Sequence, residues 1–271
     1  MFGLFKKHLE SGANKAVGQS QGNGMLHLSL NTQGRDFVIG DIHGHFELLE
    51  QLLKEVSFDK AVDRAISVGD GIDRGPESER ALEFLNKPWF YSVRGNHEAM
   101  LIDSQAREYG VYELWMRNGG EWSDQVSDDL LNRLADVYKT LPYAIEIETK
   151  NGIVGVLHAD MPSHLSWPQL TTGLSSSGLK PKELQTLLWS RDSYRSFRRA
   201  REHPEIMKEP EIPGIYRVYV GHSIVNTPCL YGNMMFIDTG AYVTGILTAV
   251  DLNNEEVIMI ENQSASPLQL R

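Results

Sequence analysis

The chain has 271 residues, 41% of them hydrophobic, so it is long enough to bury one large core. No apolar run approaches the roughly 18 to 20 residues of a membrane span, which excludes an integral membrane protein. The net charge of −10 argues against nucleic acid as a partner, because such binding needs a basic face. The single cysteine, Cys229, allows no disulfide within the chain and favours a reducing, cytoplasmic location.

The first 34 residues predict a flexible N-terminal arm. Residues 11–24 are rich in Gly, Asn, Gln and Ser, which is typical of a mobile segment, although residues 25–30 alternate as a strand would. One folded domain is expected over residues 35–262, because no linker-like composition divides it. Residues 263–271 are expected to form a C-terminal tail.

Short apolar strands alternate with helical patterns between residues 36 and 93. Strands are predicted over 37–39, 65–68 and 89–93, with a helix of clear apolar periodicity over 46–56. Pro76 and Glu77 predict the start of a second helix. This order predicts parallel strands with right-handed crossovers, and ligands bind such sheets beyond the carboxyl ends of the strands.

Helices come first in the rest of the chain, and strands of period two follow. Residues 97–140 have helical patterns, with Trp115 and Trp122 expected in the core. The pair Asn151-Gly152 separates two alternating runs and predicts a β-hairpin. Residues 160–180 predict a long loop.

The C-terminal half completes the predicted fold. Helices are expected over 182–189 and over the arginine-rich stretch 191–201, and strands are expected over 215–220, 236–237, 246–250 and 257–260. The pairing in this half is predicted to be mainly antiparallel. The fold class is therefore mixed α/β, with two packed sheets and helices outside them.

Ten polar residues lie at or just after the ends of predicted strands. They are Asp41, His43, Asp70, Asp73, Arg74, Arg94, Asn96, His97, His158 and His222. Carboxylate, imidazole and amide groups without thiolates favour Mn, Fe or Zn. So many ligands suit two ions that share a carboxylate, an arrangement that promotes in-line displacement at phosphorus.

The remaining residues of this set predict the substrate. Arg74 and Arg94 lie next to the predicted ligands, where guanidinium groups would bind phosphate oxygens in a fork. His97 follows Asn96 directly and is a candidate for the acid that protonates the leaving oxygen, with Asp73 orienting it. Each signal alone is weak, since a single Asp-X-His-Gly is more often a turn. Together they indicate a functional site, because they occur in order at the ends of successive strands.

Three segments, taken together, resemble the signature of the phosphoprotein phosphatase family of calcineurin-like metallophosphoesterases. They are Gly40-Asp41-Ile42-His43-Gly44, Gly69-Asp70-Gly71-Ile72-Asp73-Arg74-Gly75 and Gly95-Asn96-His97-Glu98. Two further segments, Trp189-Ser190-Arg191 and Ile237-Asp238-Thr239-Gly240-Ala241, are similar to the bacterial and phage branch. The resemblance covers residues 36–252.

The resemblance implies a role for each motif residue. It implies that Asp41, His43 and Asp70 hold one metal ion and that Asp70, Asn96, His158 and His222 hold the second, so that Asp70 bridges the two. It implies that Arg74, Arg94 and Arg191, together with Asn96, bind the phosphoryl group, and that His97 and Asp73 form the acid pair. It also implies a β-sandwich flanked by helices, direct attack by a hydroxide held on the two metals, and Mn²⁺ as the activator, with Fe or Zn as alternatives.

The predicted function is therefore a metal-dependent phosphomonoesterase that acts on phosphoserine and phosphothreonine in proteins or peptides, with phosphotyrosine left open. A symmetrical diadenosine tetraphosphate hydrolase is the nearest alternative, but such enzymes tend to lack the acid at Asp73 and to have Asp in place of Glu98. An inactive phospho-binding protein is a second alternative. Such a protein would be expected to have lost a ligand or the acid, and none is missing.

Three features depart from the family pattern. Ala159-Asp160 stands where the family commonly has two glycines, and Ser223-Ile224 follows His222 where the branch often has Thr-Pro. The stretch 191–201 carries five arginines that the shared pattern does not explain. That stretch predicts either a solvated helix face or a docking surface for a phosphorylated or acidic substrate.

Overall fold

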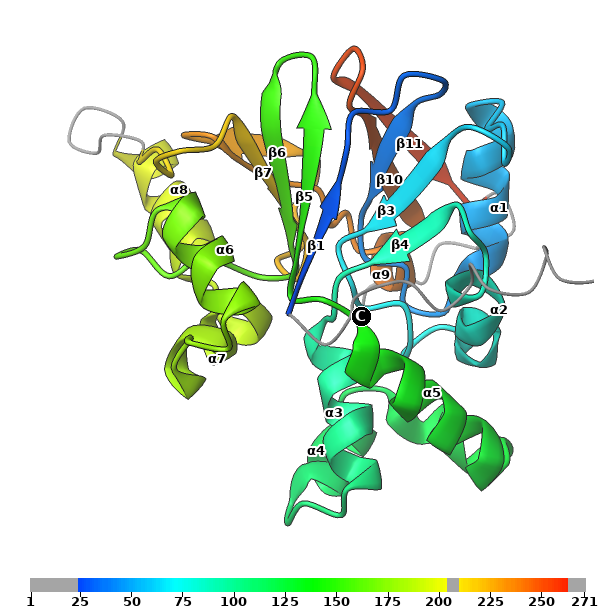
Figure 1. Cartoon of the computed structure of the whole chain (residues 1–271). Helices are drawn as coiled ribbons and strands as arrows, with labels where there is room; N and C mark the ends of the chain where they lie inside the picture. The colour runs from blue at the N-terminus through cyan, green and yellow to red at the C-terminus, as the bar shows by residue number, and fades with distance from the viewer. Residues whose placement is uncertain (1–23, 204–209, 263–271) are drawn as a thin grey trace, which may run out of the picture.

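Two β-sheets packed face to face, with helices on both outer sides, form the framework of the computed structural model (Figure 1). The structure describes residues 24–203 and 210–262. Most of the predicted N-terminal arm and all of the predicted C-terminal tail lie outside these residues. Within the described ranges, no helix has the length and apolar character needed to cross a membrane.

The first sheet has the strand order β11-β10-β2-β3-β4. Its strands are β2 (Asp36–Ile39), β3 (Arg64–Ser67), β4 (Phe90–Ser92), β10 (Ile246–Asp251) and β11 (Glu256–Glu261). Strands β2, β3 and β4 pair in parallel, as predicted from their alternation with helices, while β10 and β11 are antiparallel. The register sets Ile39 opposite Ser67 and Ser67 opposite Ser92, so the three following loops leave one edge of the sheet together.

The second sheet has the order β1-β5-β6-β7-β9-β8. Its strands are β1 (Met25–Leu28), β5 (Ala144–Thr149), β6 (Gly152–Leu157), β7 (Arg217–Val220), β8 (Cys229–Tyr231) and β9 (Met234–Phe236). The predicted hairpin at Asn151-Gly152 is confirmed. Mainly antiparallel pairing was predicted for the second half of the chain, and β5–β6, β8–β9, β10–β11 and β10–β2 confirm it. The pairs β6–β7 and β7–β9 are parallel instead. A long helical crossover joins β6 to β7, and parallel neighbours need such a connection.

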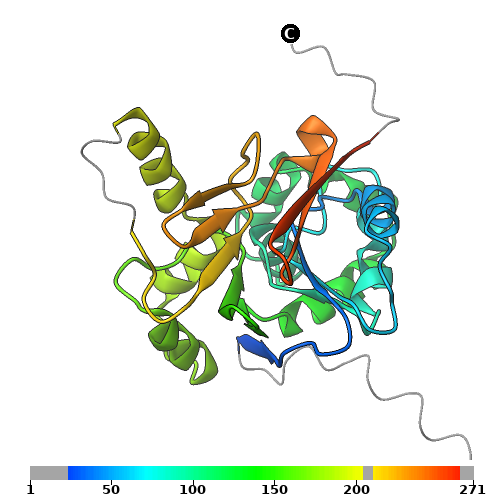
Figure 2. The same cartoon turned by 90° about the horizontal axis from the view of Figure 1, so that it is seen from above.

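The helices form the two outer layers (Figures 1 and 2). On the side of the first sheet and below it are α1 (Phe46–Glu55), the 3₁₀ turn η1 (Ser78–Arg80), α2 (Ala81–Leu85), α3 (Asn96–Gln105), α4 (Val111–Arg117), η2 (Gly120–Gln125) and α5 (Asp128–Thr140). On the side of the second sheet are α6 (Trp167–Ser175), α7 (Pro181–Trp189) and α8 (Asp192–Glu202), while the short α9 (Ala241–Thr244) precedes β10.

Alternating side chains of the central strands fill two separate apolar layers. Val38 and Ile66 point between the sheets and pack with Val154 and Val156 of β6. Phe37 and its neighbours on the opposite face pack under α1 and α2. Because both faces of these strands are covered, their sequences are continuous apolar runs rather than alternating ones.

Three local predictions were wrong. One of them is the placement of residues 25–34 in the arm: the strand expected within 25–30 is confirmed as β1, and it pairs with β5, so the sheet begins before residue 35. The predicted loop over 160–180 contains α6, which begins with a capping box in which the Gln169 side chain accepts a hydrogen bond from the Ser166 backbone N–H (2.8 Å). The helix predicted to open at Pro76 begins later, at Ala81, after η1.

We predict that the packing of α1 on the first sheet contributes strongly to stability. Leu52 is fully buried, so Leu52→Ala should lower the free energy of unfolding by about 2–5 kcal/mol through lost burial and the cavity it leaves. Urea denaturation measures this value. The exposed neighbour Gln51 is the matched control, and Gln51→Ala should change stability by less than about 0.5 kcal/mol. Equal effects of the two substitutions would contradict this packing.

Candidate metal centre

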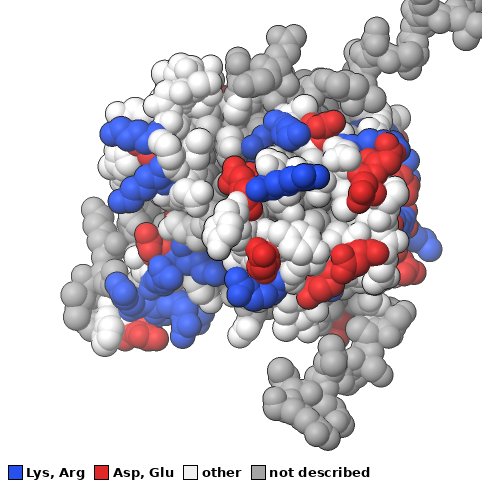
Figure 3. Space-filling model, turned by 90° about the horizontal axis from the view of Figure 1, so that it is seen from below, with Lys and Arg blue, Asp and Glu red and all other residues white. Residues whose placement is uncertain are grey.

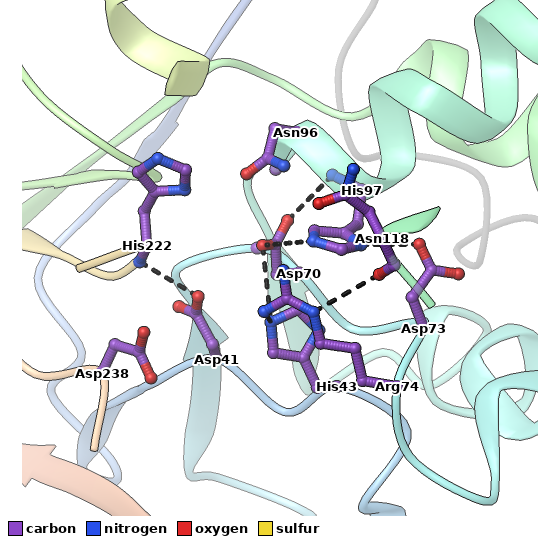
Figure 4. A network of polar contacts seen from close by, with 12 residues as sticks. Asp41, His43, Asp70, Asp73, Arg74, Asn96, His97, Asn118, His222 and Asp238 are labelled. Atoms are coloured by element: carbon purple, nitrogen blue, oxygen red, sulfur yellow. Dashed lines mark hydrogen bonds and ion pairs between the residues drawn. The ribbon is translucent and has the colours of Figure 1, made fainter. Parts of the chain in front are cut away.

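The loops after five strands bring the predicted ligands to one place, at the carboxyl ends of β2, β3, β4, β6 and β7 (Figure 4). Asp70 lies at the middle of this cluster. One of its oxygens, Oδ2, is 3.4 Å from His158 Nε2, 3.7 Å from His43 Nε2 and 3.8 Å from His97 Nε2. All four side chains are buried. The structure therefore brings together residues that are up to 115 positions apart in the sequence.

His43 and His158 each direct an unprotonated ring nitrogen at Asp70. The Nδ1 atom of His43 lies 2.9 Å from the Ile72 carbonyl, and that of His158 lies 2.9 Å from the Val68 carbonyl. Because a carbonyl oxygen only accepts hydrogen bonds, the proton of each ring is on Nδ1. The Nε2 atoms are left with lone pairs that face the Asp70 carboxylate. Backbone carbonyls orient metal-binding histidines in this same way.

His222 is fixed in the opposite tautomer. Its Nε2 atom donates to the Trp189 carbonyl (3.2 Å), which leaves Nδ1 with the lone pair. Its ring, that of His158 and the Asp70 carboxylate lie close enough for their ligand atoms to surround one ion. Asn96 Oδ1 completes this group at 2.8 Å from His158 Nε2. Ligand atoms about 2.1 Å from a metal stand roughly 3 Å apart, so this spacing fits a bound ion.

Asp41 supplies the observation that most directly fits the binding of a cation. Its Oδ2 atom accepts a hydrogen bond from the His222 backbone N–H (3.0 Å), but its buried Oδ1 atom has no hydrogen-bond partner among the described residues. A Cβ atom on Gly221 would overlap that oxygen, so a glycine is required there for Asp41 to approach. An unpartnered buried carboxylate oxygen beside converging lone pairs is expected where a metal binds.

The pKa values separate one histidine from the other three. Burial lowers the pKa of His43 and of His158, and burial together with the nearby His158 lowers the pKa of His222 to about 3. Burial also acts to lower the pKa of His97, but the charge of Asp70 and the hydrogen bond to Asp73 outweigh it, and the net pKa is raised. The first three are therefore neutral rings that can offer a lone pair to a metal ion, whereas the raised pKa of His97 favours its protonated form.

His97 is oriented by a carboxylate that two tryptophans hold in place. Its Nδ1 atom donates to Asp73 Oδ2 (2.6 Å). The indole N–H of Trp115 donates to Oδ2 of the same carboxylate (2.9 Å), and that of Trp122 donates to Oδ1 (2.6 Å). The sequence predicted the pair His97–Asp73 but assigned both tryptophans to core packing. No signal in the sequence indicated that they contact Asp73, which lies more than 40 residues earlier.

Two of the three predicted phosphate-binding arginines lie at the centre. Arg74 donates to the free Nε2 atom of His43 (3.1 Å) and stacks on the Tyr242 ring at 4.4 Å. Arg191 donates to the carbonyl of His222 (3.0 Å). Tyr242, on α9, also packs its ring edge against His43 at 4.9 Å, a contact that was not predicted.

Arg94 has a different environment from the one predicted. Its guanidinium donates to the carbonyls of Tyr138 (3.1 Å), Lys139 (2.7 Å) and Leu141 (3.2 Å) and to the Tyr143 hydroxyl (3.0 Å). These groups lie at and just beyond the C-terminal end of α5, where a cation satisfies free carbonyls and the helix dipole. Arg94 therefore anchors α5, and phosphate binding by this residue stays a prediction.

The backbone of the centre is held in an unusual conformation. His43, Asp70, Asp73, Arg74 and His222 all have positive φ, between 45° and 72°. Such values are uncommon for residues other than glycine and concentrate at functional sites. The buried Glu98 carboxylate stabilises the arrangement by accepting hydrogen bonds from the backbone N–H groups of Asp70 (3.0 Å), Gly71 (2.8 Å) and Gly95 (2.7 Å).

Converging histidine and carboxylate ligands at the edge of a helix-flanked β-sandwich define a metal-dependent hydrolase of the metallophosphoesterase class. The family model described as calcineurin-like phosphoesterase matches residues 37–226. The chain belongs to this family, and the resemblance drawn from its motifs is confirmed.

Curated relatives match most of the chain. Serine/threonine-protein phosphatase 2 of Salmonella typhimurium is 35% identical over 215 residues, which cover 78% of this chain and 90% of that protein. Serine/threonine-protein phosphatase 2 of Escherichia coli is 36% identical over 218 residues, with the same coverage. The symmetrical bis(5'-nucleosyl)-tetraphosphatase of Cellvibrio japonicus is 41% identical, but over only 76 residues, or 28% of this chain.

Solved structures confirm the fold. A crystal structure of a putative diadenosine tetraphosphatase has a TM-score of 0.60 at 22% identity and covers 89% of this chain and 99% of its own. A protein serine/threonine phosphatase from Saccharomyces cerevisiae has a TM-score of 0.60 at 18% identity and covers 91% of this chain and 86% of its own. At these identities the likeness concerns the fold alone.

We predict that Asp70→Asn weakens metal binding at both groups of ligands. Asp70 is the one carboxylate shared by the His43 side and the His158–His222 side, so its loss should lower both affinities by at least about 10- to 100-fold. Isothermal titration with Mn²⁺ and metal analysis of the purified protein measure this. Asp136→Asn, at a side chain that is 75% exposed, is the control and should bind like the wild type. Loss of one ion with the other retained would contradict the bridging position.

Proposed function

We propose that this chain is a serine/threonine protein phosphatase that hydrolyses phosphate esters in phosphorylated proteins or peptides. The observation that carries the proposal is the buried Asp73 carboxylate, hydrogen-bonded to His97 at the edge of the metal centre. This pair supplies an oriented acid for an alkoxide leaving group. Similarity to the bacterial protein phosphatases over 78% of the chain supports the same substrate class.

The centre provides the positive charge that a phosphate ester requires. Asp41, His43, Asp70, Asn96, His158 and His222 would hold divalent ions, which would supply Lewis-acid charge to the phosphoryl oxygens and nucleophilic water at neutral pH. We propose Mn²⁺ as the native metal, as the resemblance to the bacterial and phage branch implies. The donor set of imidazole, carboxylate and amide oxygen suits Fe or Zn as well. Arg74 and Arg191, which border this position, would bind the remaining phosphoryl oxygens in a fork and fix the ester for in-line attack.

His97 has the geometry of a proton donor. Because Nδ1 is hydrogen-bonded to Asp73, the proton on Nε2 is free to pass to the leaving oxygen of serine or threonine. The charge of Asp70 and the hydrogen bond to Asp73 raise the pKa of His97, which favours the protonated ring that a general acid requires. Trp115 and Trp122 hold the Asp73 carboxylate, so they keep the imidazole in the required orientation.

Symmetrical diadenosine tetraphosphate hydrolysis is the second candidate. The matches to enzymes of that name favour it, but they cover only about a quarter of the chain. The acid pair His97–Asp73 and the presence of Glu98 favour the protein phosphatase. We further propose a cytoplasmic enzyme whose catalytic domain begins at β1 and ends with β11.

A direct comparison of substrates tests the proposed function. With Mn²⁺, the protein should hydrolyse phosphoserine and phosphothreonine peptides with a kcat/KM at least about tenfold above that for diadenosine tetraphosphate. Phosphate release measures the first reaction, and chromatography of adenosine nucleotides measures the second. The metal-free protein is the control and should be inactive on both. A preference for the dinucleotide would assign the second candidate instead.

We predict that His97→Asn removes the acid but keeps the metals. Turnover of phosphothreonine peptides should fall by about 100-fold or more, because the leaving alkoxide is no longer protonated. Titration with Mn²⁺ should give the wild-type stoichiometry. Loss of metal binding would instead show that His97 is a metal ligand. Its ring nitrogen lies close enough to His43 and Asp70 to share an ion with them.

We predict that Trp122→Phe lowers kcat by about tenfold while KM, metal content and folding stay close to wild type. The change removes an N–H donor to a buried carboxylate but keeps an aromatic ring of similar shape. Trp167→Phe is the matched control, because the Trp167 indole donates to Glu146 in the second sheet and to no residue of the centre. Equal losses of kcat in both variants would contradict the positioning role of Trp122.

A further inference from the structure

Two features outside the shared family pattern, Asp160 and the arginines of α8, form one structural unit. Asp160 is 3% exposed. Its carboxylate accepts hydrogen bonds from the Ser193 backbone N–H (2.9 Å), the Ser193 hydroxyl (2.7 Å) and the Ser190 hydroxyl (3.0 Å). Ser193 is in the first turn of α8, where an acid satisfies a free N–H and the helix dipole. A glycine at this position has no side chain to do so, and Asp160 therefore anchors the start of α8.

The apolar side of α8 is fixed on the second sheet. The Tyr194 hydroxyl donates to the Ile224 carbonyl (3.2 Å), and the Tyr194 ring lies 5.8 Å from that of Phe236. The Phe197 ring lies 5.9 Å from the same Phe236 ring. Ala200, one turn further along, is buried. These contacts determine which face of α8 points outward.

The outward side carries arginines at positions 195, 198 and 199, which we call the α8 arginine face. Their spacing places them on one side of the helix together with Arg191. All three are exposed, and blue side chains gather over α8 at the lower left of Figure 3. Arg195 pairs only with Asp192 (3.1 Å), whose side chain is 82% exposed. No ion pair of Arg198 or Arg199 occurs within residues 24–203 and 210–262.

The α8 arginine face starts at the metal centre. Arg191, just before the helix, donates to the His222 carbonyl (3.0 Å). With a rise of about 1.5 Å per residue, Arg195 lies about 6 Å further along the axis, and Arg198 and Arg199 lie about 10–12 Å along it. An extended peptide advances about 3.3 Å per residue, so these distances correspond to about two to four substrate residues.

We propose that the α8 arginine face docks anionic groups located about two to four residues from the phosphorylated residue of the substrate. Guanidinium groups pair with both carboxylates and phosphates, so acidic side chains and a second phosphate are the two sources of this chemistry. The chain carries a net charge of −10, so most of its surface repels anionic substrates. The α8 arginine face is a positively charged region that attracts them. The proposal rests on the proposed function, because the bound peptide must also be the one that is hydrolysed.

The test compares phosphothreonine peptides that differ only at positions two to four on either side of the phosphorylated residue. These positions carry alanine, glutamate or one phosphoserine. The wild-type kcat/KM should be about tenfold higher for the anionic peptides than for the alanine peptide, and high salt should reduce this preference. Arg195→Gln/Arg198→Gln/Arg199→Gln should remove the preference. Hydrolysis of p-nitrophenyl phosphate should stay unchanged, because this compound is too small to reach α8.

Two further variants control for charge and for folding. Lys54→Gln/Lys60→Gln/Arg133→Gln removes the same charge from exposed positions outside α8, and it should keep the wild-type preference. Replacing the three arginines of α8 by lysine keeps the charge, and this variant should retain most of the preference. Glutamine and lysine have helix propensities close to that of arginine, so α8 should form in each variant, as circular dichroism would check.

Each outcome has a definite meaning. Equal hydrolysis of all peptides by the wild type, or a preference that survives the triple glutamine substitution, would overturn the docking proposal and leave the proposed function intact. Failure to hydrolyse any phosphopeptide, with diadenosine tetraphosphate cleaved, would overturn both. If a single-stranded DNA oligonucleotide binds the α8 arginine face while the peptides show no preference, the face is a nucleic-acid site and the docking proposal is wrong.

Discussion

The charge of Asp70 constrains the structure around it. Its carboxylate is 2% exposed, and burial of an ionised carboxylate is costly unless positive charge lies beside it. The His97 backbone N–H donates to Asp70 Oδ1 (3.0 Å), and three histidine ring nitrogens lie 3.4 to 3.8 Å from Oδ2. Two of these ring nitrogens offer lone pairs rather than protons, because their other nitrogens donate to backbone carbonyls. Cations bound at this position would therefore stabilise the buried carboxylate.

The sandwich fold makes this concentration of charge possible by bringing five loops to one edge. Parallel pairing of β2, β3 and β4 aligns the ends from which Asp41, Asp70 and Asn96 emerge. Positive φ angles at Asp70 and Asp73 turn both side chains toward the centre. Glu98 compensates for this strain, because its carboxylate joins the loops after β3 and β4 through three backbone hydrogen bonds. Rigid loops of this kind hold the candidate metal ligands and His97 in fixed relative positions before a substrate binds.

Around this shared centre, the chain has its own features. Asp160 stands where the family commonly has a glycine, and its carboxylate anchors the start of α8. This helix carries the α8 arginine face beside the site. Trp115 and Trp122 place two indole donors on Asp73 and so connect the α4–η2 region to the acid His97. Both features leave the metal ligands unchanged. Elements around a shared centre are the places where members of one fold differ in function.

The sequence by itself predicted the candidate metal ligands and the His97–Asp73 pair, and it determined the parallel strands β2 to β4, because each motif is a short local pattern at the end of an apolar strand. It also predicted the hairpin at Asn151-Gly152 from local turn chemistry. Only the tertiary structure decided that Arg94 anchors the end of α5, that Trp122 binds Asp73 and that Asp160 anchors α8. It also decided the parallel pairing of β6 with β7. These contacts join segments 30 or more residues apart, and the packing of helices against sheets, not any local preference of the chain, sets which of them meet.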